Sequence, residues 1–331
     1  MPRQLHSNHT IRRYTALGLF LIALWLPHQA GSADAPLSVS PQISNTTSTL
    51  LSIHFRTLQD GWAVGAGGTM LQTSDGGKKW KRIASGTSAL LTSVFFVDPL
   101  HGWVAGAAGL LKHTTDGGRS WLTQPLDTQQ PLYGLFFTSP TVGWVVGGSG
   151  MIFHTTDGGE HWVEQGSGTT AALYAAHFLN DQRGTIVGAL GTVLSTNDGG
   201  TTWTPQEMQH AVTLFDVFFT DTETGWVVGN AGALFRTIDG GAQWVDHTLP
   251  CGKTCTRLTD LLKIRFTSPR EGWIVGERGM LYRTTDAGLT WSEGKSIVPS
   301  SLFGLSFPDS VGGWASGENG TIVQLSHAGD R

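Results

Sequence analysis

Residues 143–162 read GWVVGGSGMIFHTTDGGEHW and contain the two motifs that decide the fold. The first motif is a Gly-Trp pair followed by apolar residues and another glycine. The second is Thr-x-Asp-[Gly/Ala]-Gly-x-x-Trp, an Asp box. Both motifs recur along the chain at a fixed spacing, and self-similarity at a period of about 40 residues is the signature of a repeat architecture.

The Gly-Trp motif occurs in seven copies, although Thr185 replaces the tryptophan in the fourth. The steps between successive second residues are 41, 41, 41, 41, 47 and 41 residues, so a six-residue insertion lies around Cys251 and Cys255. The Asp box occurs in six copies and is absent from the seventh. Its aspartates are Asp75, Asp116, Asp157, Asp198, Asp239 and Asp286.

Each copy has the pattern of four short strands. The first strand resembles the apolar run 91–96, the second is Gly-Trp-Val-Val-Gly, the third resembles residues 151–155, and the fourth begins at the Asp-box tryptophan. Between the second and third strands, Gly147-Gly-Ser-Gly150 suits a tight turn with positive φ. Four antiparallel strands per ~40 residues predict an all-β, seven-bladed β-propeller. The blades start near residues 50, 91, 132, 173, 214, 261 and 302.

The seventh copy ends without an Asp box or a fourth strand, which would leave a sheet edge unpaired. Residues 37–41, Leu-Ser-Val-Ser-Pro, alternate in period two just before the first copy. Proline suits an edge strand. We therefore expect this N-terminal segment to form the outer strand of the last blade and to close the ring.

Residues 1–33 have the pattern of a signal peptide, and residues 34–331 form the predicted propeller. Arg12 and Arg13 precede an apolar run, residues 16–26, that is too short to span a bilayer. Cleavage after Ala33 is preferred over cleavage after Ala35. We expect a mature monomer that is exported to the periplasm, or to the thylakoid lumen in a photosynthetic organism, without membrane insertion. Its 18 basic and 25 acidic residues give no basic footprint for nucleic acid.

The Asp boxes are predicted to be turn chemistry, with the Asp carboxylate and Thr hydroxyl accepting backbone N–H groups. Calcium prefers six to eight oxygens, whereas each box supplies one carboxylate. We therefore predict no metal and no cofactor. Cys251 and Cys255 are expected to form a disulfide-stapled loop, with a redox role as the alternative.

First strands line the channel of a propeller, so their polar residues are informative. One aligned column contains Ser52, Ser93, Gly134, Ala175, Asp216, Lys263 and Gly304. Two positions further along lie His54, Phe95, Phe136, His177, Phe218, Arg265 and Ser306. Asp216 and Lys263 are expected to pair. They form either a structural ion pair or, together with Arg265, His54 and His177, a site for a protein partner.

Catalytic motifs such as Gly-x-Ser-x-Gly and His-Glu-x-x-His are absent from the sequence. The Asp boxes, also known as BNR repeats, resemble those of sialidases, but the arginine signature of that family is missing. The mature chain has three tyrosines, Tyr133, Tyr174 and Tyr282, and all occupy repeat-equivalent strand positions. We expect no enzyme, with a sialidase-like glycoside hydrolase as the weaker alternative.

The repeats resemble more closely those of the photosystem II stability/assembly factor family, over almost all of the mature chain. The resemblance lies in the combination of seven repeat copies, the pattern Phe-Phe-x-[Asp/Ser]-Pro-x-x-Gly-Trp-[Val/Ala]-x-Gly and the Thr-Thr-Asp-Gly-Gly-x-x-Trp box. Residues 137–147 and 266–276 are similar to this pattern. It implies a propeller that binds a membrane-protein subunit during assembly of a photosynthetic complex. The alternative is a periplasmic scaffold for another envelope complex.

Overall fold

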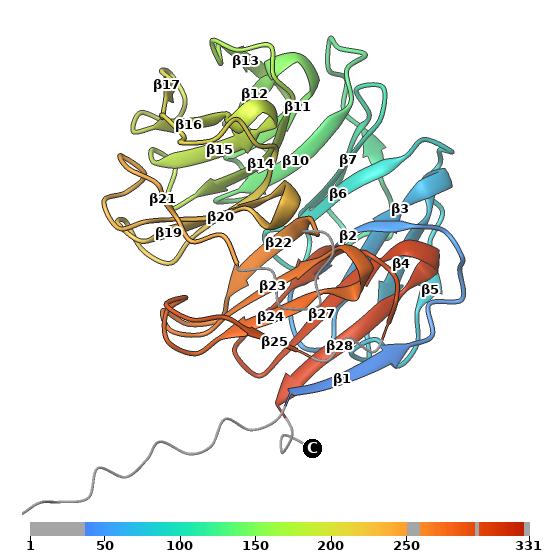
Figure 1. Cartoon of the computed structure of the whole chain (residues 1–331). Coiled ribbons are helices and arrows are strands. Elements are labelled where there is room, and N and C mark those ends of the chain that lie inside the picture. The colour runs from blue at the N-terminus through green and yellow to red at the C-terminus, as the bar shows by residue number, and fades with distance from the viewer. Residues whose placement is uncertain (1–36, 250–258, 295–297, 328–331) are drawn as a thin grey trace, which may run out of the picture. The chain divides into compact units, whose positions relative to one another are not determined.

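The computed structural model describes residues 37–249, 259–294 and 298–327 and shows a seven-bladed β-propeller (Figure 1). Each blade is a four-stranded antiparallel sheet, as predicted. The described residues contain short 3-10 turns and no α-helix. Among them, therefore, no helix has the length and apolar character of a membrane span. The predicted signal peptide, residues 1–33, and the cysteine pair, Cys251 and Cys255, lie outside the described residues and stay predictions.

The innermost strands surround the propeller axis, and each contacts the innermost strands of both neighbouring blades. The ring closes where β26 contacts β2. These strands are β2 (Leu50–Phe55), β6 (Leu91–Phe96), β10 (Leu132–Phe137), β14 (Leu173–Phe178), β18 (Leu214–Phe219), β22 (Leu261–Phe266) and β26 (Leu302–Ser306). Each pairs with its neighbour through a register irregularity near its first residue, at the same place in all seven blades.

The remaining strands follow in order from the axis outwards. The second strands are β3 (Gly61–Gly65), β7 (Gly102–Gly106), β11 (Gly143–Gly147), β15 (Gly184–Gly188), β19 (Gly225–Gly229), β23 (Gly272–Gly276) and β27 (Gly312–Gly317). The third strands are β4 (Met70–Thr73), β8 (Leu111–Thr114), β12 (Ile152–Thr155), β16 (Val193–Thr196), β20 (Leu234–Thr237), β24 (Leu281–Thr284) and β28 (Ile322–His327).

The outer strands are short and begin one residue after the Asp-box tryptophan, not at it. The tryptophan belongs to the turn because its ring folds back onto the blade; Trp80, for example, is 5% exposed. The outer strands are β5 (Lys81–Arg82), β9 (Leu122–Thr123), β13 (Val163–Gln165), β17 (Thr204–Pro205), β21 (Val245–Asp246) and β25 (Ser292–Glu293). Strand β1 (Leu37–Gln42) takes this place in the seventh blade.

Neighbouring blades are joined by stacked aromatic rings. Trp144 of β11 lies over Phe178 of β14 in the next blade, with ring centroids 3.6 Å apart and planes 14° from parallel. The glycine before each such tryptophan leaves room for a phenylalanine of its own blade: a Cβ at Gly143 would lie 2.2 Å from Cδ1 of Phe137. The same Trp–Phe pair recurs as Trp62–Phe96, Trp103–Phe137, Trp226–Phe266, Trp273–Phe307 and Trp314–Phe55.

The N-terminal strand closes the ring as the sequence predicts. β1 pairs antiparallel with β28, with Val39 opposite Leu325 and Pro41 opposite Val323 (Figure 1). Gln42 then reaches the first blade, where its Nε2 donates to the carbonyl of Gly76 at 3.1 Å. Its Oε1 accepts from Nε1 of Trp80 at 3.2 Å. The first and last segments of the described chain thus hold one another in place.

Deleting residues 34–42 from the mature chain tests this closure. We expect the melting temperature to fall by roughly 10 °C, because the deletion removes a hydrogen-bonded strand and one kcal/mol corresponds to about 2–4 °C in a chain of this size class. Calorimetry would measure the change. Deletion of residues 34–36, which precede β1, serves as the control and should leave the melting temperature unchanged. Equal melting temperatures for both deletions would contradict the closing role of β1.

Candidate functional site

The innermost strands line a central cavity of about 320 Å³. Both columns predicted from the sequence face it, including Asp216, Lys263 and Arg265. The bulge-like irregularity at the start of each strand sets the direction of the side chains that follow, and alternate residues of a strand share one face. Asp216 and Phe218 therefore face the same cavity, as do Lys263 and Arg265.

Asp216 is the centre of a charged cluster between β18 and β22. Its Oδ1 lies 3.2 Å from Nζ of Lys263, which confirms the expected pair. Its Oδ2 lies 2.6 Å from Nη1 of Arg265 and also accepts the Ile264 backbone N–H at 3.0 Å. Arg265 was expected near this site but not as a direct partner of Asp216.

The three side chains of this cluster differ in exposure. The Asp216 side chain is 3% exposed, whereas those of Lys263 and Arg265 are 25% and 31% exposed. Burial disfavours the charged form of Asp216, but the charges of Arg265 and Lys263 and the Ile264 N–H outweigh it. Together they hold the pKa of Asp216 below its usual range. The carboxylate is thus ionised and enclosed, while both cations keep surface facing the cavity.

His54 and His177 belong to an arc of rings that follows the cavity wall from β2 to β18 and ends beside the charged cluster, where Arg265 lies over Phe218. Successive ring centroids lie 5.1, 5.6, 5.3 and 4.9 Å apart in the order His54, Phe95, Phe136, His177, Phe218. Burial lowers the pKa of His54 to about 4 and that of His177 to about 3. The two histidines are therefore neutral at pH 7, and two phenylalanines separate them. The structure does not bring them together with Asp216 as a single binding group.

Two tyrosines add to the cavity wall. Tyr133 and Tyr174 line the cavity, with ring centroids 5.1 Å apart. Both occupy the predicted repeat-equivalent strand positions, but neither was among the predicted site residues. Their position in the first strand, one residue before the column that contains Asp216, was the available signal. Aromatic rings of β2, β6, β10, β14 and β18 therefore line the cavity beside the charged cluster of β18 and β22.

The Asp boxes form the predicted turn contacts. In the first box, Thr73 Oγ1 accepts the Gly77 N–H at 2.9 Å, and Asp75 Oδ1 accepts the Lys79 N–H at 2.9 Å. The Lys79 N–H and the Thr73 hydroxyl hold the pKa of Asp75 below its usual range. Equivalent threonine and aspartate contacts occur at Asp116, Asp157, Asp198, Asp239 and Asp286.

The third box also gathers three groups that are able to bind a metal. Ligand atoms of Asp157, Glu160 and His161 lie within 4.8 Å of one another. However, Asp157 Oδ2 contacts Nδ1 of His161 at 2.8 Å, and Oδ1 accepts the His161 N–H. Hydroxyl groups make the same Oδ2 contact in other boxes, as at Ser120. The histidine thus closes a turn in the way that a serine does elsewhere.

A model of the family described as "Photosynthesis system II assembly factor YCF48" matches residues 38–132 and 202–296, which is more than half of the chain. The chain belongs to this family. The matched segments cover all four strands of the first, second, fifth and sixth blades, including their Asp boxes and the whole Asp216 cluster. No curated protein matches the chain in sequence.

Two solved YCF48 structures are similar to the chain. One, described as YCF48 bound to D1 peptide, has a TM-score of 0.73 and 23% identity and covers 91% of this chain and 100% of its own. YCF48 from Cyanidioschyzon merolae has a TM-score of 0.73 and 22% identity, covering 87% and 98%. A streptogramin B lyase has a TM-score of 0.76 at 13% identity, covering 88% and 98%. At these identities the similarity shows the propeller fold alone.

Replacing Asp216 by Asn tests the charged cluster. Because the pKa of Asp216 is lowered on folding, its stabilising contribution is complete above the unfolded value of about 3.9 and is lost as the pH falls through the folded value. We expect D216N to reduce the free energy of unfolding by about 2–4 kcal/mol at pH 7 and by less near pH 3. Urea denaturation at the two pH values measures this. The control, D60N, removes a more exposed pair and should lower stability by less than about 1 kcal/mol. An equal loss at both pH values would argue against the ionised cluster.

The aromatic arc predicts a second pH effect. The pKa values of His54 and His177 lie below that of a free histidine, about 6.5. Above about pH 6.5 both histidines are neutral in the folded and unfolded states, so their burial carries no protonation cost. Below this pH the unfolded chain binds protons that the folded protein does not, so the two histidines increasingly destabilise the fold. Phenylalanine fills the equivalent place in three blades. The double variant H54F/H177F should therefore gain stability relative to the wild type on acidification to about pH 4.5. Thermal melts at this pH and at neutral pH would show it; a pH-independent difference would refute it.

Proposed function

We propose that the chain is a non-catalytic, exported assembly factor that binds a segment of a membrane-protein partner. Its membership of the YCF48 family supports a role in assembly. A relative with the same fold has been solved with a D1 peptide, which supports a protein partner from a membrane complex. The chain acts as a monomer in the periplasm, or in the thylakoid lumen of a photosynthetic organism.

The central cavity is the proposed binding site, and its charge is the observation that carries this proposal. One carboxylate, Asp216, and two cations, Lys263 and Arg265, line the cavity among the described residues. The carboxylate is buried and paired, so the accessible charge is positive. The phenylalanine and tyrosine rings that line the same cavity offer apolar surface. This combination suits a peptide segment that carries an acidic group beside apolar side chains.

The same charges support a function without catalysis. Glycoside hydrolases of the common kinds use a pair of carboxyl groups that flank the bond to be broken. In the described part of the channel, Asp216 is the single carboxylate, and its two oxygens are already bound by three partners. Neither His54 nor His177 contacts it. We therefore favour binding over a sialidase-like reaction.

A crosslinked pull-down from membranes of the source organism tests the proposal. Wild-type protein should recover a membrane-complex subunit, and recovery of no membrane protein would refute a membrane partner. A photosystem subunit would support assembly of that complex. An envelope subunit would instead support the alternative, a periplasmic scaffold.

The site is tested by the triple variant D216A/K263S/R265F. Each new residue is taken from an equivalent position in another blade (Ala175, Ser52 and Phe95), so the variant should keep the fold. We expect partner recovery to fall at least about tenfold, as when a charge-assisted contact is lost. The control, K81S/R82S, removes two cations from the exposed strand β5 and should recover the partner normally. Normal recovery by the triple variant, with an unchanged melting temperature, would exclude the channel as the binding site.

A further inference from the structure

The interface between the fourth and fifth blades lacks the ring stack that joins the others. Thr185 of β15 stands where six blades have a tryptophan, and it faces Phe219 of β18. Phe219 keeps its edge contact with Trp244, at 5.9 Å between ring centroids. Phe219 therefore lacks the tryptophan, and the ring of the fourth blade that stacks on it is His177, with centroids 6.2 Å apart and planes 21° from parallel.

A second side chain is also reduced in size at this place. Ser195 of β16 pairs with Thr185 across the sheet. In the two preceding blades this position is His113 or His154, and each stacks on its tryptophan, with ring centroids 4.5 and 4.7 Å apart. Arginines lie over the tryptophans of the fifth and sixth blades. The fourth blade thus lacks two adjacent layers of the stack.

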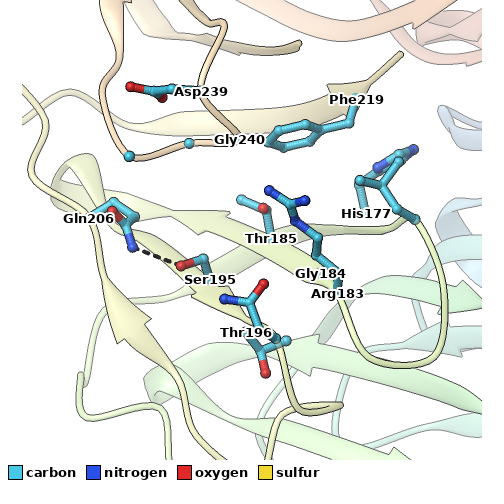
Figure 2. Close-up of a pocket in the computed structure, with 14 residues that line it drawn as sticks. His177, Arg183, Gly184, Thr185, Ser195, Thr196, Gln206, Phe219, Asp239 and Gly240 are labelled. Atoms are coloured by element: carbon cyan, nitrogen blue, oxygen red, sulfur yellow. Dashed lines mark hydrogen bonds between the residues drawn. The ribbon is translucent and has the colours of Figure 1, made fainter. Parts of the chain in front are cut away.

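A pocket of about 210 Å³ occupies this place, as Figure 2 shows. Thr185, Phe219 and Gly184 form its buried inner wall. Asn197 and Asp239, at the rim, are exposed, so the pocket opens to solvent between the blades. For comparison, a dry cavity of about 150 Å³ is sufficient to bind benzene.

Arg183 supplies a positive charge inside the pocket. Figure 2 shows its guanidinium group between Thr185 and Phe219, pointing towards Gly240. A Cβ at Gly240 would lie 2.1 Å from Nη2 of Arg183, so glycine leaves the room for this side chain. Among the described residues, no carboxylate forms an ion pair with Arg183, in contrast to Arg56 and Arg283.

Gln206 adds a second polar group. At three other interfaces, Gln42, Gln124 and Gln165 donate to the Asp-box carbonyl of the next blade. Gln206 occupies the equivalent position, but its Nε2 donates instead to Ser195 Oγ at 2.7 Å, within the pocket (Figure 2). Consequently Nε1 of Trp244 is buried without a hydrogen-bond partner among the described residues.

The geometry points to a binding site for a flat carboxylate between the fourth and fifth blades. The ligand carboxylate pairs with Arg183, whose guanidinium group occupies part of the space left by the missing tryptophan, and the ligand ring lies in the remaining space of the pocket beside Phe219. A guanidinium group matches a carboxylate through two parallel hydrogen bonds. The hydroxyls of Thr185 and Ser195 and the amide of Gln206 are able to donate hydrogen bonds to the remaining lone pairs of the ligand carboxylate. This site is separate from the charged cluster of the channel and does not depend on the proposed partner.

Titration of the mature protein with benzoate, with binding measured by calorimetry or ligand-observed NMR, tests the site. Benzamide has the same flat ring without the negative charge and serves as the control compound. We expect benzoate to bind at least about tenfold more tightly than benzamide. A short peptide with a C-terminal phenylalanine distinguishes the source of the carboxylate: binding of the peptide assigns it to a protein chain end, and binding of benzoate alone to a free acid. Absence of benzoate binding, or equal binding of benzamide, overturns the proposal.

Two variants locate the binding. R183M keeps the apolar stem of the side chain but removes the charge, and it should weaken benzoate at least about tenfold with little effect on benzamide. T185W restores the residue of the other blades, fills the pocket and should abolish binding while the melting temperature stays at or above that of the wild type. Undiminished benzoate binding by folded T185W would place the ligand elsewhere and refute the site. The channel variant D216A/K263S/R265F should bind benzoate normally, which separates this site from the proposed partner site.

Discussion

The stacking of a tryptophan from one blade on a phenylalanine of the next is the contact on which the propeller depends. Phe137 illustrates it. Trp103 of the preceding blade covers one face of its ring at 3.5 Å, Gly143 of its own blade packs closely against the same ring, and Trp162 of the Asp box meets its edge at 6.0 Å. The Gly-Trp pair and the Asp box are therefore parts of a single packing unit centred on one ring. A side chain at the glycine would push the ring out of the stack.

This aromatic packing unit also explains how a chain with few charges and many short strands forms a closed propeller. Each outer strand has two or three residues in the first six blades, so little stability comes from its own hydrogen bonds. The aromatic contacts between blades provide the buried area instead, and the Trp–Phe pair joins six of the seven interfaces. The last pair, Trp314 on Phe55, joins the seventh blade to the first at 3.6 Å. Strand β1 is longer than the other outer strands, and through Gln42 it supports the same junction.

The fold could be predicted from the sequence because the motifs that form it repeat. The site could be predicted only in part, because its residues differ from blade to blade. Repeated motifs located the strands, the Asp-box contacts and the closing strand. The pair between Asp216 and Lys263 also followed from aligned columns. The position of Arg265 on the same carboxylate, and the burial that keeps His54 and His177 neutral, depend on neighbouring blades and left no pattern in the chain. Thr185, which replaces the tryptophan of the Gly-Trp motif, was visible in the sequence, but its effect could be seen only once the structure placed Ser195 and Arg183 around it.

The interface between the fourth and fifth blades shows how a missing tryptophan can be tolerated without the neighbouring side chains filling the pocket. Truncating a buried tryptophan ordinarily costs about 3–5 kcal/mol, and surrounding side chains then move to reduce the void. Here Phe219 is held from the side by Trp244, and the backbone of the Asp box fixes Gly240 through its bond from the Gly240 N–H to the Glu223 carbonyl at 2.8 Å. The walls of the pocket therefore belong to rigid repeat elements, while the groups inside it, Arg183 and Gln206, come from positions that vary between blades. A rigid frame around variable polar groups is the arrangement in which a binding site is preorganised, because little motion is needed to admit a ligand.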